Sequence, residues 1–295
     1  MIPFFVRQFS LMVLMTLGVS IEYICGNFDL AFAAQISASS LLSVFLVTKG
    51  VPIVISWIMI FVFNGLIGCM KGVFITKFRI PSIIVTLAFQ MILVNFCAGI
   101  TNGTNLSMPS LKELYKVFPM ELIEIGLAVM GLAVTHYFLN YTYYGKYCYM
   151  LGENMALAEK NGLNCTAVSA LIHGAVSLFF SIPAILLAMY TGSGSGSLGM
   201  GYLYQVLAAM LLGRNMVYGK KKSVFGIFGG AFVLVLFTCI LTAKGHLNQW
   251  ENILEGIVIL VCLSREHRKK SENSPPKSEN PHIEKITEQG KIKTQ

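Results

Sequence analysis

Amide side chains at Gln35, Gln90 and Asn95 stand inside runs of residues that are otherwise apolar. A primary amide both donates and accepts hydrogen bonds, so it can exchange bonds with a polyhydroxy solute as water does. Unpaired polar groups are costly in lipid, and these amides should therefore face other helices or a wet passage. They are our candidates for lining a translocation path. The serines near Gln35 fit hydrogen bonds between helices better.

Ionisable side chains are scarce inside the apolar runs, which argues against a carrier that relays protons between carboxylates. Asp29 lies near the end of a run, where capping a helix is as good an explanation as transport. Glu22 is expected at the membrane interface. A carrier driven by an ion gradient would also show inverted repeats with broken helices, and we find none clearly.

Three other patterns suggest chemistry that we set aside. Residues 213–221 resemble a phosphate-binding loop but have one residue too many between the glycines, so we expect no ATP hydrolysis by this chain. The stretch TGSGSGSLG, residues 191–199, is interpreted as a flexible turn outside the cell. The seven cysteines form no CxxC pair, and we predict small apolar residues with no disulfide framework and no metal site.

The elements that must position these residues are membrane spans. Of 295 residues, 55% are hydrophobic and only 12% are charged, and the mean hydropathy is +0.67, values that exclude a soluble domain. Apolar runs near the roughly 20 residues of a membrane helix recur along the chain, predicting an all-α polytopic membrane protein. Nine spans are expected, of which 199–217 is the least secure. They cover residues 2–24, 30–48, 51–70, 80–100, 121–143, 166–190, 199–217, 223–243 and 247–263.

Basic residues set the expected orientation, because basic loops near span ends are retained in the cytoplasm. Alternation from a cytoplasmic C-terminus assigns 17 Lys and Arg to inner segments, including 71–79, and four to outer ones. The N-terminus is then outside. Residues 1–263 form the predicted membrane domain, and 264–295 form a basic, disordered cytoplasmic tail whose charge does not point to nucleic acid.

A polar island, residues 143–164, separates two apolar runs on the inner side. Its inner part is predicted to be a short helix that begins after Gly152 and ends at Gly162, since glycine commonly ends helices. A solvated connection is the plainer interpretation. A helix displayed at the membrane face by a protein without catalytic residues is better explained as a contact for a partner.

The island resembles the cytoplasmic coupling loop of sugar-type permeases of ATP-binding-cassette (ABC) importers. The coupling-loop residues that this resemblance assigns are Gly145, Lys146, Tyr149, Gly152, Glu153, Asn154, Ala158 and Gly162. All match the family pattern except Glu153, which replaces a family glycine. Three further stretches resemble the family in the same order, through Asp29 and Leu30, through the run from Asn64 to Leu87 with Ile80 and Pro81, and through Gly213, Gly219, Ser223, Val224 and Gly226.

The resemblance implies a type II ABC importer permease of the ribose, xylose, arabinose and galactoside class, related to branched-chain amino acid permeases. It implies a bacterial plasma (inner) membrane location, a second permease subunit, identical or different, and cytoplasmic ATPases that hold ATP and Mg²⁺. An extracytoplasmic solute-binding protein would deliver a monosaccharide, and we assign the outer loop 101–120 to that contact. This chain would bind no cofactor and would not itself be an enzyme. Nucleoside and branched-chain amino acid permeases share the architecture and remain alternatives.

The chain departs from the family at several points. Arg214, Glu153 and Lys222 replace glycines, where close helix contacts in membranes need small residues. The family has ten helices with both ends inside, and its first helix has no counterpart here, so the true start is expected upstream or the gene is truncated. Three interpretations are left open. The chain is a divergent half of a heterodimer, a decayed copy, or a pseudo-permease that only occupies an ATPase.

Overall fold

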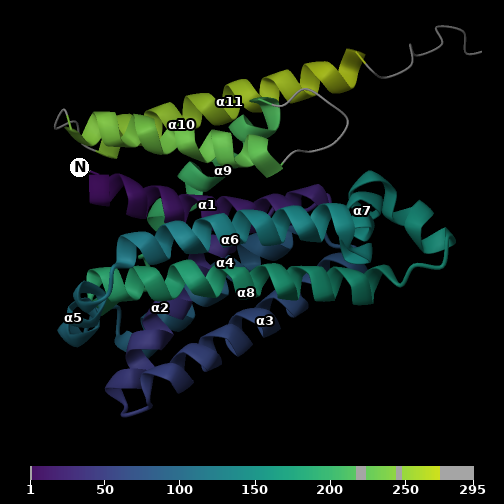
Figure 1. Cartoon of the computed structure of the whole chain (residues 1–295). Coiled ribbons are helices and arrows are strands. Elements are labelled where there is room, and N and C mark those ends of the chain that lie inside the picture. The colour runs from purple at the N-terminus through teal and green to yellow at the C-terminus, as the bar shows by residue number, and fades with distance from the viewer. Residues whose placement is uncertain (1, 217–223, 244–247, 273–295) are drawn as a thin grey trace, which may run out of the picture. The chain divides into compact units, whose positions relative to one another are not determined.

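The computed structural model describes residues 2–216, 224–243 and 248–272, and these form almost only helices (Figure 1). Contacts divide the chain into two units, residues 1–259 and 260–295. The α-helices are α1 (Ile2–Ile24), α2 (Phe32–Thr48), α3 (Ile53–Lys77), α4 (Ser82–Thr101), α5 (Pro109–Val117), α6 (Met120–Tyr141), α7 (Tyr143–Lys160), α8 (Cys165–Thr191), α9 (Leu203–Met216), α10 (Val224–Ala243) and α11 (Asn248–Glu272). Two short strands, β1 (Leu106–Ser107) and β2 (Ser193–Gly194), and the 3-10 helix η1 (Met200–Tyr202) complete the described elements.

The nine predicted spans each correspond to one helix, namely α1, α2, α3, α4, α6, α8, α9, α10 and α11. Six helices of the described residues are long and apolar enough to cross a membrane: α1, α3, α4, α6, α8 and α10. The 17-residue α2 is apolar but shorter. The chain is thus an all-α polytopic membrane protein. The predicted span 199–217 contains η1 followed by the 14-residue α9.

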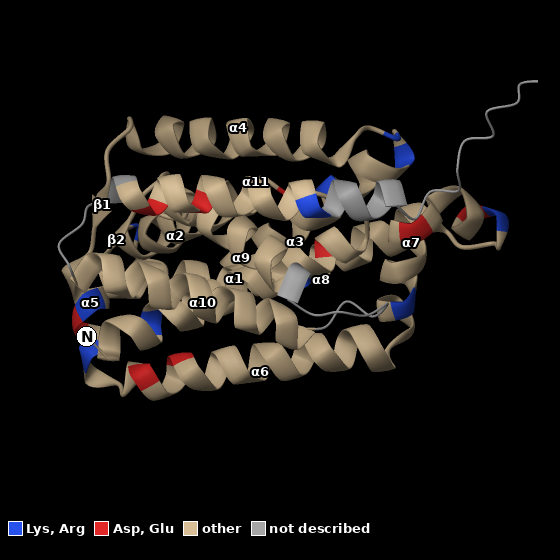
Figure 2. Ribbon diagram, turned by 90° about the horizontal axis from the view of Figure 1, so that it is seen from above, with Lys and Arg blue, Asp and Glu red and all other residues tan. Residues whose placement is uncertain are grey.

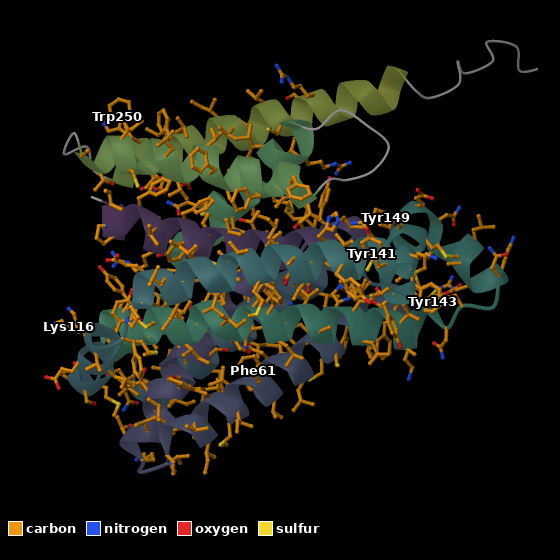
Figure 3. The ribbon with its side chains drawn as sticks, viewed as in Figure 1. Phe61, Lys116, Tyr141, Tyr143, Tyr149 and Trp250 are labelled. Carbon is orange, nitrogen blue, oxygen red and sulfur yellow. The ribbon has the colours of Figure 1, made fainter. Side chains whose placement is uncertain are left out.

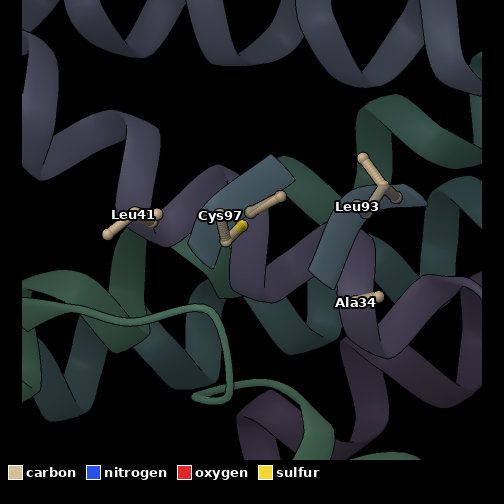
Figure 4. Close-up of a cluster of buried hydrophobic side chains, with 5 residues drawn as sticks. Ala34, Leu41, Leu93 and Cys97 are labelled. Atoms are coloured by element: carbon tan, nitrogen blue, oxygen red, sulfur yellow. The ribbon is translucent and has the colours of Figure 1, made fainter. Parts of the chain in front are cut away.

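The centre of the first unit is α2, which packs among α3, α4 and α8. Every α2 residue from Phe32 to Leu41 is buried. A helix buried on all sides needs no polar face, which explains its uniformly apolar and serine-rich sequence. Where α4 crosses it, Ala34, Ala38 and Leu41 pack against Leu93 and Cys97 (Figure 4).

Within this unit α5 and α7 contact opposite ends of α8 (Figure 1). Lys, Arg, Asp and Glu gather mostly at these two ends, as Figure 2 shows. We call them the α5 end and the α7 end. Leu111 fixes α5, which lies within the loop 101–120, by packing with Val44 and Ala188.

The segment 191–199 is not the flexible turn that its composition suggested. Ser193 and Gly194 form β2, which pairs antiparallel with β1. Gly194 then lies so close to α2 that a Cβ there would be 2.8 Å from the Cα atom of Leu41. Glycine is common in turns because it is flexible, but here its missing side chain permits close backbone packing.

Some sequence predictions fall on residues outside the described ranges. They concern the family matches Gly219 and Ser223, the basic residues Lys220, Lys221, Lys222 and Lys244, and residues 273–295 of the predicted tail. The tail was predicted to begin at 264, but α11 continues to Glu272, so residues 264–272 are helical and not disordered. All seven cysteines lie within the described part and form no disulfide there, and six of them are buried. This confirms the prediction that the cysteines form no disulfide framework.

Candidate functional site

The polar island folds as α7, which consists of two helical segments. Asn154 interrupts the helix with extended backbone angles, φ −161° and ψ 97°. The first segment begins after Thr142, whose hydroxyl accepts a hydrogen bond from the amide of Gly145 at 3.0 Å. The sequence predicted only the second segment, because the tyrosines of the first did not suggest a helix.

Local hydrogen bonds define both ends of the second segment. The side-chain oxygen of Asn154 accepts a bond from the amide of Leu157 at 3.0 Å, the geometry of a helix N-cap. At the other end the Gly162 amide donates to the carbonyl oxygen of Glu159 at 2.9 Å, and the Leu163 amide donates to that of Ala158 at 3.1 Å. This is a Schellman motif, with Gly162 at φ +82°. The predicted stop at Gly162 is confirmed, and the start shifts from Gly152 to Asn154.

Two glycines join the first segment to the membrane helices. A Cβ on Gly145 would lie 2.2 Å from the carbonyl oxygen of Phe138 in α6. A Cβ on Gly152 would lie 2.0 Å from the carbonyl oxygen of Ile24, where α1 ends. Both approaches are too close for any other residue. Movement of α7 would therefore press directly on the backbone of α1 and α6.

The remaining predicted coupling residues differ in exposure. Lys146, Glu153 and Asn154 are exposed, Tyr149 is half-buried and Ala158 is buried. Burial, followed by the electrostatic effect of the neighbouring Cys148, raises the pKa of the Tyr149 hydroxyl above its ordinary value, so the side chain stays neutral. Figure 3 shows Tyr149 at the α7 end together with Tyr141 and Tyr143.

The second segment of α7 also contacts the connection between α3 and α4. Arg79 pairs with Glu159 at 3.0 Å, and both side chains are exposed, by 75% and 36%. A cavity of about 500 Å³ lies beside this pair. Its lining residues include Gly26 and Pro81 from the helix connections and Met155 from α7. Sequence reasoning missed Arg79 and Glu159, although Arg79 directly precedes the family-like pair Ile80 and Pro81.

A buried charge cluster lies beneath this surface. The Lys71 Nζ atom is 2.6 Å from Asp29 Oδ2 and 3.5 Å from Glu22 Oε1. Exposure is 0% for Lys71 and Glu22 and 2% for Asp29. The other Asp29 oxygen accepts a bond from the amide of Ala31 at 2.7 Å, just before α2. Lys71 therefore ties α3 to α1 and to the turn that starts α2.

His173 of α8 lies under the same turn. Its Nδ1 atom is 2.8 Å from the carbonyl oxygen of Ser169, so that nitrogen must carry the proton. Its Nε2 atom is 3.2 Å from the side-chain nitrogen of Asn27, which donates to it in a neutral ring. Residues 25–31 are consequently held by α3 through Lys71, by α8 through His173, and against α7 through Gly152.

Three sequence predictions need correction here. Lys71 is buried within α3, which continues to Lys77. It therefore does not belong to the predicted inner loop 71–79. Glu22 is buried and not interfacial. Ionisable groups within the helices are therefore more prominent than predicted. The reason is that opposite charges from different helices neutralise one another, which single spans cannot reveal.

The three candidate path amides do not come together. Gln35 is buried and donates to the carbonyl oxygen of Asn64 at 3.1 Å. Gln90 is partly buried, with its carbonyl oxygen unpartnered among the described residues. Asn95 is exposed and donates to Met91 of its own helix at 2.8 Å. A role in transport remains a prediction for all three.

Asn64 of α3, which the sequence marked only as part of a family match, is the polar centre of this region. It accepts a bond from Ser39 of α2 at 2.8 Å and donates to Ser181 of α8 at 2.7 Å. The prediction that serines near Gln35 bond between helices is confirmed for Ser39. Ser37 instead bonds to Ala33 of its own helix.

Comparisons with known proteins extend over nearly the whole chain. The family model described as "Branched-chain amino acid transport system / permease component" matches residues 1–263. The ribose import permease protein RbsC of Escherichia coli is 23% identical, over 90% of this chain and 84% of its own. The fructose import permease protein FruG of Bifidobacterium longum is 22% identical, over 85% and 77%. The autoinducer 2 import system permease protein LsrC of an Enterobacter species is 23% identical, over 86% and 75%. No solved structure matches.

Proposed function

We propose, since this chain belongs to the branched-chain amino acid transport system permease family, that it is the membrane subunit of an ATP-driven importer of a small polar solute. A monosaccharide is the proposed cargo, because the similar proteins include permeases named for ribose and fructose. Both of these come from bacteria, which supports a bacterial plasma membrane location. The protein would be a transport subunit without catalytic activity of its own.

The observation that carries the proposal is the build of α7. It is a largely exposed, capped, two-part helix in which Gly145 and Gly152 lie directly against the backbone of α6 and α1. A cytoplasmic ATPase docked on it would transmit motion to the membrane helices. ATP and Mg²⁺ would be held by that partner. The α7 end would face the cytosol with the C-terminus, and the α5 end would receive an extracytoplasmic solute-binding protein.

Coupling would follow two routes from α7. Gly152 contacts the end of α1, and Glu159 contacts Arg79 between α3 and α4. Both routes reach residues 25–31, the second because Ser82 at the start of α4 accepts a bond from the Phe28 amide at 3.0 Å. Lys71 and His173 hold this segment in place. A partner shifts a conformational equilibrium only if it binds one state better than the other. Closure of the ATPases would bias the inward and outward states of a pair of permease subunits through these contacts.

Replacement of Gly152 tests the proposal most directly. Gly152→Val puts a side chain against the Ile24 carbonyl oxygen and should abolish uptake while ATP hydrolysis by the partner continues. Gly126→Val is the matched control, because a Cβ on Gly126 of α6 meets nothing within 4 Å. Both variants are measured in vesicles with the ATPase and binding protein encoded by neighbouring genes. Full, ATP-coupled uptake by Gly152→Val would remove α7 from the mechanism.

The cargo can be identified separately. Calorimetry of the neighbouring binding protein against ribose, fructose, autoinducer 2, nucleosides and amino acids should show the tightest binding for a monosaccharide. Preference for a nucleoside or an amino acid would keep the importer and correct its substrate. Cargo binding without uptake by the wild-type complex would instead favour a permease-like subunit that only occupies the ATPase.

A further inference from the structure

The glycine- and serine-rich stretch after α8 enters the helix bundle. Gly192 ends α8 in the left-handed region at φ +64°, and the chain then follows α2. A Cβ on Gly194 would be 2.8 Å from the Leu41 Cα atom, and one on Gly199 would be 2.5 Å from the Ala33 carbonyl oxygen. Those two contacts are eight residues apart on α2, which is about 12 Å along a helix at 1.5 Å per residue. The stretch therefore descends from the α5 end toward the first turn of α2.

Contacts along the stretch hold it in this position. The amide of Gly199 donates to the Ser37 hydroxyl at 2.9 Å. Met200 packs on the cluster where α2 and α4 cross, which Figure 4 shows around Ala34 and Cys97. Gly196 lies against Cys97 itself, where a Cβ would be 2.8 Å away. One face of the stretch is thus packed on two membrane helices.

The opposite face is open. Ser197 and Gly201 are exposed, and a Cβ on Gly201 would meet nothing within 4 Å. Tyr204, in the first turn of α9, is 58% exposed. The Ser195 side chain is buried, and its hydroxyl lies 3.0 Å from that of the exposed Ser197. The open face therefore presents the Ser197 hydroxyl and backbone that is not α-helical.

Backbone of this kind cannot face lipid. In the hydrocarbon region of a bilayer there is no water to satisfy amides and carbonyls, so non-helical segments occur only where protein covers them or water fills a cavity. We propose that the open face of residues 197–201 lines the water-filled solute path. Its hydroxyl and backbone groups suit a polyhydroxylated solute, whose hydroxyls they can bind in place of water. This inference rests on the proposed importer function. It adds to the lining of the solute path a segment that the sequence analysis did not include.

Cysteine labelling tests the proposal in native membranes that hold the full chain. The variants are Ser197→Cys and Gly201→Cys, and the probe is a small, charged methanethiosulfonate that cannot cross membranes. The wild type gives the background labelling rate, since six of its seven cysteines are buried and Cys69 is only partly exposed. The lipid control is Leu66→Cys on α3, where the native side chain is 61% exposed on an apolar face.

Both test variants should react at least about tenfold faster than Leu66→Cys, because only a hydrated thiol ionises and the thiolate is the reactive form. Two variants are used so that failure of one to reach the membrane does not decide the result. Rates for both that equal Leu66→Cys or the wild type would overturn the proposal.

A second reagent measures depth. A polyethylene-glycol maleimide should label Lys116→Cys on the exposed part of α5 but not Ser197→Cys or Gly201→Cys. Figure 3 shows Lys116 at the α5 end. Equal labelling of all three by the large reagent would place the stretch at the surface and overturn the proposal.

Labelling needs neither ATP nor cargo, so this test can fail separately from the importer proposal. ATP-driven uptake by the wild type with no labelling at residues 197 and 201 would refute only the path. Selective labelling in a complex that never takes up any solute would support the path's position and refute the importer.

Discussion

At the residue scale, the Lys71 cluster is the least expected feature of this protein. Burying an unpaired charge costs several kcal/mol, and a close partner offsets that cost only when the geometry is good. Lys71 reaches Asp29 at 2.6 Å and Glu22 at 3.5 Å from a position with no exposure. The pairing orders residues 25–31, on which the contacts from α7 converge. A structural role and the proposed coupling role would therefore coincide in one side chain.

Lys71→Met should destabilise the protein, since Asp29 and Glu22 would be left buried without their cation. Breaking a buried pair costs about 3–5 kcal/mol, enough to lower the melting temperature measurably. Thermal unfolding in detergent measures the effect. Lys77→Met, at the exposed end of the same helix, is the control and should be close to neutral.

Neutralising the carboxylates as well distinguishes charge from packing. Lys71→Met combined with Asp29→Asn and Glu22→Gln should recover part of the lost melting temperature, because no unpaired charge remains. A triple variant as unstable as Lys71→Met alone would show that the lysine acts through its packing.

Gly162 gives a second prediction at this scale. Its φ of +82° strains any L-residue except those that tolerate the left-handed region, while the space around it is open. Gly162→Leu should therefore reduce uptake per ATP hydrolysed, and Gly162→Asn should retain most of it. Equal coupling in both variants would argue that the end of α7 need not be ordered.

At the element scale, α7 acts as two short helices and not as one. Asn154 lies between them, and each segment has its own contacts, Gly152 to α1 and Glu159 to Arg79. A partner that grips the second segment would move the α3–α4 connection, and one that grips the first would move α1. We therefore expect coupling to depend on both segments and on the joint between them.

The Arg79 and Glu159 pair allows a test of the second contact. Exposed ion pairs contribute at most about 1 kcal/mol, so Arg79→Glu should leave the melting temperature nearly unchanged. Coupled uptake should nevertheless fall, because like charges would now separate α7 from the α3–α4 connection. Adding Glu159→Arg should restore uptake by reversing the pair. If the double variant couples no better than Arg79→Glu alone, the contact is not part of the coupling route.

At the scale of the whole molecule, the described charged side chains gather chiefly at the α5 and α7 ends of the first unit, as Figure 2 shows. The exposed surfaces of α3 and α4 between these ends are largely apolar. Such a distribution suits a bilayer around the middle of the helices. It leaves open which end faces the cytosol, and the distribution of basic residues in the sequence supports the α7 end.

Side-specific labelling decides the orientation. An impermeant thiol reagent should label Glu153→Cys in inverted vesicles but not in intact cells, and Lys116→Cys the other way round. Both native side chains are exposed, so neither replacement disturbs the core. Labelling of Glu153→Cys from outside intact cells would remove the ATPase contact and, with it, the importer proposal.

The sequence by itself determined the class of protein, the positions of nine of the helices, the helical stop at Gly162 and the family resemblance. These follow from local properties, namely long apolar runs, a glycine after a polar helix and motifs in order. Only the tertiary structure decided that Lys71 meets Asp29, that residues 192–202 run along α2, and that Asn95 faces away from the packed core. The physical reason is that lipid and protein interior are both apolar, so periodicity does not reveal which way a membrane helix is rotated. Contacts between distant helices depend on that rotation.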